Sequence, residues 1–177
     1  DREHTPKEKI ALQILSTMLT DTMYSRIFGL AREKGLVYGM GSGGTYAKNL
    51  SGWWLGAQVS KTNSAPLLRL VRDELKRIGD GIIDDEDFES ASRHLLGKTM
   101  RAGQTAGGLV GRYGHYYFDG TIENLNLLPK RMKQVDKKMC IELLSEMIKA
   151  NNWGLGVLGS TSLIPARKLQ SYVAELF

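Results

Sequence analysis

Arg32 and Tyr38 are the residues best placed to do chemistry, because they lie six positions apart where a predicted helix joins a predicted strand. A guanidinium is always charged and offers five N–H donors, while a phenol offers one hydroxyl. At one junction, the two side chains could hold a polar group. The plainer interpretation is a capped helix feeding a strand, with Arg32 in water and Tyr38 half-buried.

The spacing around this junction predicts how the chain positions both side chains. Leu30 is expected to face the core, and Arg32 lies in a polar last turn, where cations favour the helix dipole. Gly35 is expected to end the helix in a left-handed conformation. Residues 36–41 then alternate in the manner of a strand, which would carry Tyr38.

Two neighbouring segments have the alternation of paired strands. Residues 36–47 and 50–60 flank a two-residue turn at 48–49 and predict a hairpin. Four residues of the second segment are expected on one face: Trp53, Leu55, Ala57 and Val59. Residues 153–157 alternate as a final strand, so a small sheet is expected.

Helical spacing is found over most of the remaining sequence. Pro66 is expected to start one helix, and glycines at 103, 107 and 111 indicate a weak helix that bends or packs closely on a neighbour. The predicted helices cover residues 7–19, 24–34, 66–78, 85–100, 121–133, 136–149 and 165–176, with caps at Asp84 or Asp85, Thr121 and Asp136. We therefore predict one α+β domain over residues 1–177, with an antiparallel or mixed sheet of three or four strands and helices mainly on one face.

Composition narrows the functional classes. The chain has 177 residues, 42% of them hydrophobic and 24% charged, and no apolar run of about 18 residues that would predict a membrane span. The net charge of +5 is scattered among acidic residues, and the densest basic run, residues 130–138, holds no aromatic side chain for stacking on bases. Neither a nucleic-acid partner nor a membrane partner is expected.

The sequence offers no metal site of familiar spacing. Its three histidines, His4, His94 and His115, are dispersed, and it contains no His-x-x-Glu-His motif. Cys140 is the single cysteine, which excludes an internal disulfide and favours a reducing compartment. We assign no metal to this chain and expect a cytoplasmic location, with a periplasmic one left open because the chain starts without a methionine.

The glycine-rich segment at residues 39–44 could be mistaken for a phosphate-binding loop. A dinucleotide fingerprint opens a helix, whereas these glycines lie inside one predicted strand and lead to another. The better interpretation is a flat or bulged strand that lets another backbone come close, either a partner domain or a peptide along an edge.

Residues 25–38, SRIFGLAREKGLVY, resemble the "SRLF…RE…GL.Y" signature of the pitrilysin/insulinase/mitochondrial-processing-peptidase family of zinc metallopeptidases, in its non-catalytic C-terminal half. Further blocks are similar to that family in the same order: residues 52–60, 65–78, 85–97, 116–120, 135–143 and 153–159. The resemblance covers nearly the whole chain.

The resemblance implies a division of labour between two homologous halves that enclose a chamber. Zinc would be bound in the first half by His-x-x-Glu-His and a distant Glu, and an Arg and a Tyr of the second half would reach the substrate. Those two would be Arg32 and Tyr38, although the family usually spaces them seven positions apart and this chain spaces them six. The implied function is the substrate-binding, non-catalytic half of a zinc endopeptidase; the alternative is a non-enzymatic scaffold or peptide-binding subunit that has lost catalysis.

The resemblance also implies partners. A catalytic half of the same fold is expected, in the same chain or a separate subunit, together with a peptide substrate and a possible homo-oligomer. The family domain normally carries one or two strands ahead of its first helix, so we expect an uncovered sheet edge or a strand supplied by a partner. The aromatic residues at 113 and 116–118 are expected to add to this unburied surface.

Overall fold

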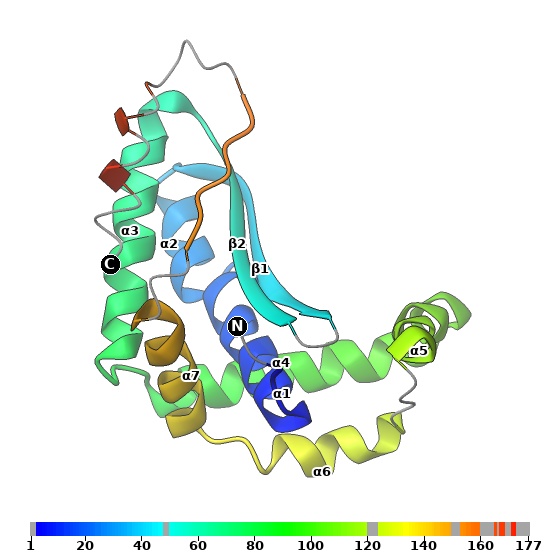
Figure 1. The fold of residues 1–177 in the computed structure, drawn as a ribbon. Helices are drawn as coiled ribbons and strands as arrows, with labels where there is room; N and C mark the ends of the chain where they lie inside the picture. Colours follow the sequence, from blue (N-terminus) through cyan, green and yellow to red (C-terminus); the bar gives the residue numbers. More distant parts are fainter. Residues whose placement is uncertain are drawn as a thin grey trace.

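The computed structural model describes residues 3–47, 50–119, 124–149 and 153–159, together with 165, 167–168 and 171–172. It is mostly helical with one antiparallel hairpin, which confirms the α+β class (Figure 1). In chain order the elements are α1 (Pro6–Ser16), the π-helical turn η1 (Thr17–Asp21), α2 (Arg26–Glu33), β1 (Val37–Ala47), β2 (Leu50–Val59), α3 (Lys61–Gly79), α4 (Asp85–Ala102), α5 (Ala106–Asp119), the 3-10 turn η2 (Leu125–Leu127), α6 (Leu128–Met132) and α7 (Lys137–Lys149).

Helix α1 begins at Pro6, one residue before the predicted start. The Thr5 hydroxyl accepts a hydrogen bond from the Glu8 amide at 3.3 Å, and the Glu8 carboxylate accepts one from the Thr5 amide at 2.7 Å. Pro6 follows in the first helical position, where its missing N–H has no consequence. The start of this helix is therefore set by local chemistry.

The second half of helix α1, from Ile10 to Ser16, lies in the core. Such a helix usually buries one face, with Ile10, Ile14 and Leu15 as its apolar side chains here, yet Ala11 and Leu12 are buried as completely as Ile14 and Leu15. The physical reason is that α1 contacts β1 on one side and α4, α6 and α7 on others, so between Ile10 and Ser16 only Gln13 is exposed (Figure 1).

A buried network of hydroxyl groups joins the end of α1 to the hairpin. The π-helical turn η1 frees backbone carbonyls, and the Thr20 hydroxyl donates to the Ser16 carbonyl at 3.2 Å. The hydroxyls of Thr20 and Ser42 are 2.7 Å apart, and Nε1 of Trp53 donates to the Ser16 hydroxyl at 2.9 Å. Ser42 lies on β1 and Trp53 on β2, so both strands are tied to this turn.

The hairpin β1–β2 has the predicted antiparallel pairing, with Met40 opposite Ala57 and Ser42 opposite Leu55. Trp53 and Leu55 pack against the core as predicted. Ala57 and Val59, expected on the same face, are exposed, because the core beneath β2 ends at Leu55.

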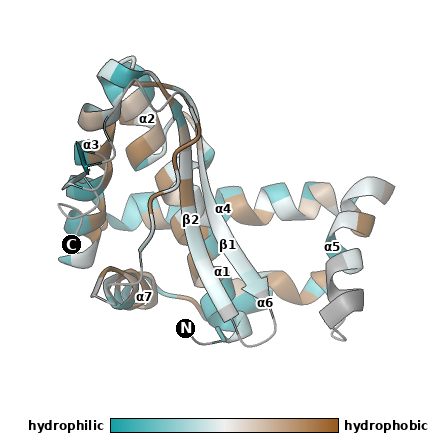
Figure 2. Cartoon of the chain, turned by 45° about the horizontal axis from the view of Figure 1, so that its top comes forward, coloured by the Kyte–Doolittle hydropathy of each residue, from teal (hydrophilic) through white to brown (hydrophobic). Residues whose placement is uncertain are grey.

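The sheet of the described chain has two strands where three or four were expected. Residues 153–157, predicted as a strand, have no strand pairing here and run as an extended segment beside β2 in Figures 1 and 2. The segment is held by its first side chain, since the Trp153 ring meets Trp53 edge-on at 6.4 Å and donates from Nε1 to the Met147 carbonyl at 2.9 Å.

Helix α3 starts at Lys61, so the prediction that Pro66 begins it is wrong. A tertiary contact holds the extra first turn, since the Asn63 amide group donates to the carbonyls of Gly35 at 3.0 Å and Leu36 at 3.3 Å. This contact ties α3 to the link between α2 and β1. Because its partners are far apart in the sequence, the residues around Lys61 alone do not predict it.

The predicted weak point near Gly103 is a true break, because α4 ends there and α5 turns away (Figure 1). The predicted cap of α7 is confirmed by the Asp136 carboxylate, which accepts from the Met139 amide at 2.9 Å. The helix predicted over residues 121–133 is described only from residue 125 onward. Thr121, the side chains of residues 115–118 and most of the predicted helix 165–176 lie outside the described residues. No helix of the described parts is both long and apolar enough to cross a membrane.

Gly29 allows the loop after η1 to approach α2, since a methyl group at this position would lie 2.6 Å from the Met23 carbonyl oxygen. We expect Gly29→Ala to lower the free energy of unfolding by about 1–3 kcal/mol, because backbone cannot easily move aside. Gly97→Ala in α4 is the matched control: its methyl would meet only the mobile Arg101 guanidinium, and helix propensity should then add up to about 1 kcal/mol. Urea unfolding of both variants tests this, and equal stabilities would contradict it.

Candidate functional site

The link between α2 and β1 has the predicted glycine cap. Gly35 adopts φ 64°, and its amide donates to the Arg32 carbonyl at 2.9 Å. The Leu36 amide reaches back to the Ala31 carbonyl at 2.8 Å. This pair of hydrogen bonds closes the helix C-terminus and leaves only a short link before the strand.

A β-bulge then turns Tyr38 outward. Val37 pairs with Val59 and Gly39 with the adjacent Gln58, so Tyr38 is an extra residue with no partner on β2. Its side chain is 82% exposed, while that of Val37 is buried. Regular alternation and a half-buried Tyr38 are therefore wrong at this point, because the bulge shifts the register by one residue.

The structure brings Arg32 and Tyr38 together. Nη1 of Arg32 donates to the Tyr38 carbonyl at 3.0 Å, and the guanidinium carbon lies 5.8 Å from the centre of the Tyr38 ring. An exposed cation–π contact of this kind contributes about 0.5–1 kcal/mol. Within the described chain the Tyr38 hydroxyl and the other N–H groups of Arg32 have no protein acceptor, so they can serve a ligand.

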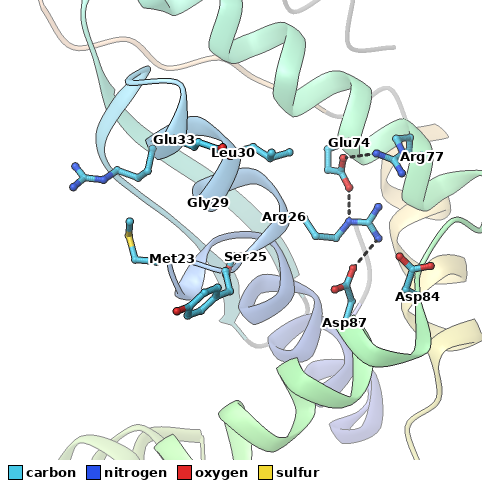
Figure 3. A pocket seen from close by; sticks show the side chains of 12 residues that line it. Met23, Ser25, Arg26, Gly29, Leu30, Glu33, Glu74, Arg77, Asp84 and Asp87 are labelled. Carbon is cyan, nitrogen blue, oxygen red and sulfur yellow. Dashed lines mark hydrogen bonds and ion pairs between the residues drawn. The ribbon is translucent and has the colours of Figure 1, made fainter.

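Arg32 also borders an open depression of about 700 Å³, shown in Figure 3. The depression is bounded by α2 and the loop before it, by α3, and by the start of α4. Its lining residues are Met23, Tyr24, Ser25, Arg26, Gly29, Leu30, Arg32, Glu33, Glu74, Arg77, Asp84 and Asp87. The arginine of the candidate pair therefore belongs to two adjoining surfaces.

Apolar side chains stand around this depression without cover. Met23 is about half exposed, Tyr24 almost fully, and Leu30 about one-third. The expected core position of Leu30 is wrong. The buried stripe of α2 runs through Ile27 and Ala31, and Leu30 is turned about 100° from Ala31.

An ion-pair cluster that the sequence analysis did not predict forms the inner wall of the depression. Nε of Arg26 bonds to the Glu74 carboxylate, while its Nη1 reaches the Ile82 carbonyl at 2.9 Å and Asp87 at 3.5 Å (Figure 3). Glu74 also lies 3.5 Å from Arg77. Arg26 thus fastens the start of α2 to both α3 and α4.

A signal for this cluster was present in the sequence. Glu74 shares the helical spacing of Val71, Leu75 and Ile78, which are all buried, so its carboxylate had to be buried and paired. The charged residues of α3 resemble those of a solvated helix face when they are considered alone. The apolar spacing shows that Glu74 lies on the buried face of that helix.

The described residues do not fit a zinc site, since none of them form a group of three His, Cys, Asp or Glu side chains. His94 lies 3.6 Å from Asp21, whose carboxylate is already bound by Lys98 at 2.7 Å. Cys140 is buried and donates to the Ala11 carbonyl at 3.6 Å. Burial, and then the charge of Asp136, raise the pKa of this thiol to about 12, so it is neither a nucleophile nor a ready ligand at neutral pH.

Comparison with known proteins identifies the family. The model of the peptidase M16 inactive domain matches residues 3–95, which is more than half of the chain. This protein therefore belongs to the peptidase M16 family, as its non-catalytic, C-terminal type of domain. The resemblance proposed from the sequence is confirmed.

Named relatives agree with this assignment. A Streptomyces coelicolor protein named as an uncharacterized zinc protease is 31% identical over 113 residues, which cover 62% of this chain and 24% of that protein. A putative M16-like peptidase from Alicyclobacillus acidocaldarius has a TM-score of 0.68 at 17% identity, over 79% of this chain and 33% of that one. The peptidase M16 inactive domain from Pseudomonas fluorescens has a TM-score of 0.63 at 22% identity, over 80% and 34%. This chain spans about a quarter of the curated relative and a third of these structures.

The ion-pair cluster gives a test of how α2 is held. The side chains of Arg26 and Glu74 are only 10% and 5% exposed, so Arg26→Ala strips a buried carboxylate of its main partner. We expect a loss of about 3–5 kcal/mol in the free energy of unfolding. Arg93→Ala is the control, because its pair with Glu89 is exposed on both sides and should contribute less than about 0.5 kcal/mol. Similar losses in the two variants, measured by urea unfolding, would show that the buried pair does not anchor α2.

Proposed function

We propose that this protein is the substrate-holding, non-catalytic half of a zinc-dependent endopeptidase of the M16 family. The observation that carries the proposal is the exposed Arg32–Tyr38 pair, which a β-bulge and a glycine cap present at the surface. Because the family is one of peptidases, the ligand that we propose for this pair is a peptide. The zinc-protease name of the curated relative supports the metal chemistry of the whole protein.

The pair suits a peptide carbonyl. The hydroxyl of Tyr38 can donate one hydrogen bond to that oxygen, and it becomes more effective as the oxygen gains negative charge during hydrolysis. Arg32 supplies fixed positive charge beside it and steadies the Tyr38 backbone with one of its five N–H groups. Because both groups rest on fixed backbone, little reorganisation is needed when a substrate arrives.

Metal chemistry would come from elsewhere in such an enzyme. The described residues here do not fit zinc, so we propose that a catalytic half of the same fold holds the ion and that this half positions the peptide. The curated relative is about four times as long as the part that matches, so most of its sequence has no counterpart in this chain.

Removing one hydroxyl tests the role of Tyr38. In the intact enzyme, Tyr38→Phe should lower kcat/KM by the equivalent of about 2–4 kcal/mol with stability almost unchanged, because one donor to the developing charge is lost. Arg32→Ala should act in the same direction. Tyr24→Phe is the matched control, since Tyr24 is also exposed and also lines the depression that Arg32 borders, and this variant should retain turnover. Normal turnover in Tyr38→Phe would refute the proposed hydrogen bond.

The described residues do not fit a metal site, and this leads to a second measurement. We expect the purified 177-residue chain to retain no stoichiometric zinc after dialysis and to cleave no peptide, because its dispersed histidines and one thiol cannot form an open tetrahedral site. Elemental analysis gives the metal content. One tightly held zinc per chain would overturn the assignment of this half as non-catalytic.

A further inference from the structure

Met23 is the most exposed methionine of this chain. It is 54% exposed, whereas Met18 and Met132 are buried and the other four are intermediate. All seven methionines lie among the described residues, at positions 18, 23, 40, 100, 132, 139 and 147. An oxidant must reach the sulfur of a thioether to modify it, so exposed methionines react before buried ones. Exposure therefore singles out Met23 among the seven.

The loop that carries Met23 is held in place on both sides of this residue. The Ser25 hydroxyl donates to the Thr17 carbonyl at 2.9 Å and accepts from the Thr22 amide at 2.8 Å. The Met23 carbonyl oxygen lies against Gly29, where a methyl group would be only 2.6 Å away. Because these contacts fix the backbone against α2, the Met23 thioether stays at the surface.

The thioether also borders the depression beside α2. Met23, Tyr24 and Leu30 are the exposed apolar side chains of its lining and are called the apolar rim below. Figure 3 shows Met23 on the side of the depression away from Glu74. Arg32 lines the same space. A group bound in the depression would cover part of the apolar rim, and removal of that area from water would favour binding.

A hydroperoxide can convert this thioether to a sulfoxide without help from another side chain. The sulfur lone pair attacks one oxygen of hydrogen peroxide, so an S–O bond forms while the O–O bond breaks. The departing hydroxide takes the proton of the transferred oxygen and leaves as water. Sulfur is oxidised by two electrons, which reduce the peroxide. The reaction replaces a flexible apolar group with a polar one.

We propose that Met23 is a redox-modification site, which a hydroperoxide oxidises before any other methionine of this chain, and that its sulfoxide weakens ligand binding at the depression. The second part rests on the proposed function, because it takes the ligand to be the peptide that the Arg32–Tyr38 pair would hold. A peptide that covers the apolar rim would have to strip water from the sulfoxide oxygen, which is costly unless a new hydrogen bond replaces it. Oxidation then raises KM and leaves the Tyr38 hydroxyl as it was.

Peptide mapping by mass spectrometry tests the site, and its result does not depend on the proposed function. The intact protein is treated with limiting hydrogen peroxide, and we expect the Met23 sulfoxide to appear first. Met18 is the matched control, since it is buried in η1 and should oxidise much more slowly. Equal or faster oxidation of another methionine of this chain would overturn the proposal. So would protection of Met23, because another part of the intact protein would then cover it.

Peptide hydrolysis by the intact enzyme tests the consequence. Limited oxidation should raise KM by about threefold or more with kcat unchanged, and methionine sulfoxide reductases should restore the original value. Met23→Leu replaces the thioether with an apolar side chain of similar volume, so its KM should not respond to the same peroxide treatment. An equal rise in KM in Met23→Leu, or no rise in the wild type, would overturn the effect on binding. Lower turnover in Tyr38→Phe together with either result would refute this inference and leave the proposed function standing.

Discussion

The burial of the second half of α1, where residues 10–16 are all buried except Gln13, is the constraint on which the rest of this structure depends. Apolar side chains on most sides of this half of the helix must be covered, and β1, α4, α6 and α7 cover them. Its last turn widens into a π-helical turn, and the carbonyls released there are satisfied by hydroxyls that also bind the hairpin. The position of the sheet is thereby fixed relative to the helix that precedes α2.

The candidate site combines a rigid base with exposed side chains. Arg26 fastens α2 to α3 and α4, Gly29 lets the preceding loop approach, and Asn63 ties α3 to the link before β1. On this base the bulge leaves Tyr38 in water with Arg32 against it. Such exposure of an aromatic side chain contributes nothing to burial, so packing of the core does not account for the position of Tyr38.

Local chemistry made part of this structure predictable from the sequence. The capping box at Thr5, the left-handed Gly35, the hairpin and the Asp136 cap each follow from a few neighbouring residues. Features set by distant contacts were missed: the early start of α3 depends on a bond to the α2–β1 link, and Glu74 is paired with Arg26 from another helix. A flat or bulged strand was expected at residues 39–44, but the bulge lies at Tyr38, and its position was missed because alternating residues 36–41 fit a regular strand equally well. The pairing of Arg32 with Tyr38 was expected from family resemblance, whereas spacing alone left both in ordinary surroundings.

The central claim is that Arg32 and Tyr38 act as one unit on a bound peptide. A double-mutant cycle measures this, with Arg32→Ala, Tyr38→Phe and the combined variant compared for peptide affinity in the intact protein. We expect each single change to weaken binding, and the combined loss to differ from their sum by at least about 0.5 kcal/mol, because the two side chains are in contact and share a ligand. Wild-type affinity in both single variants, or losses that add fully, would contradict the account.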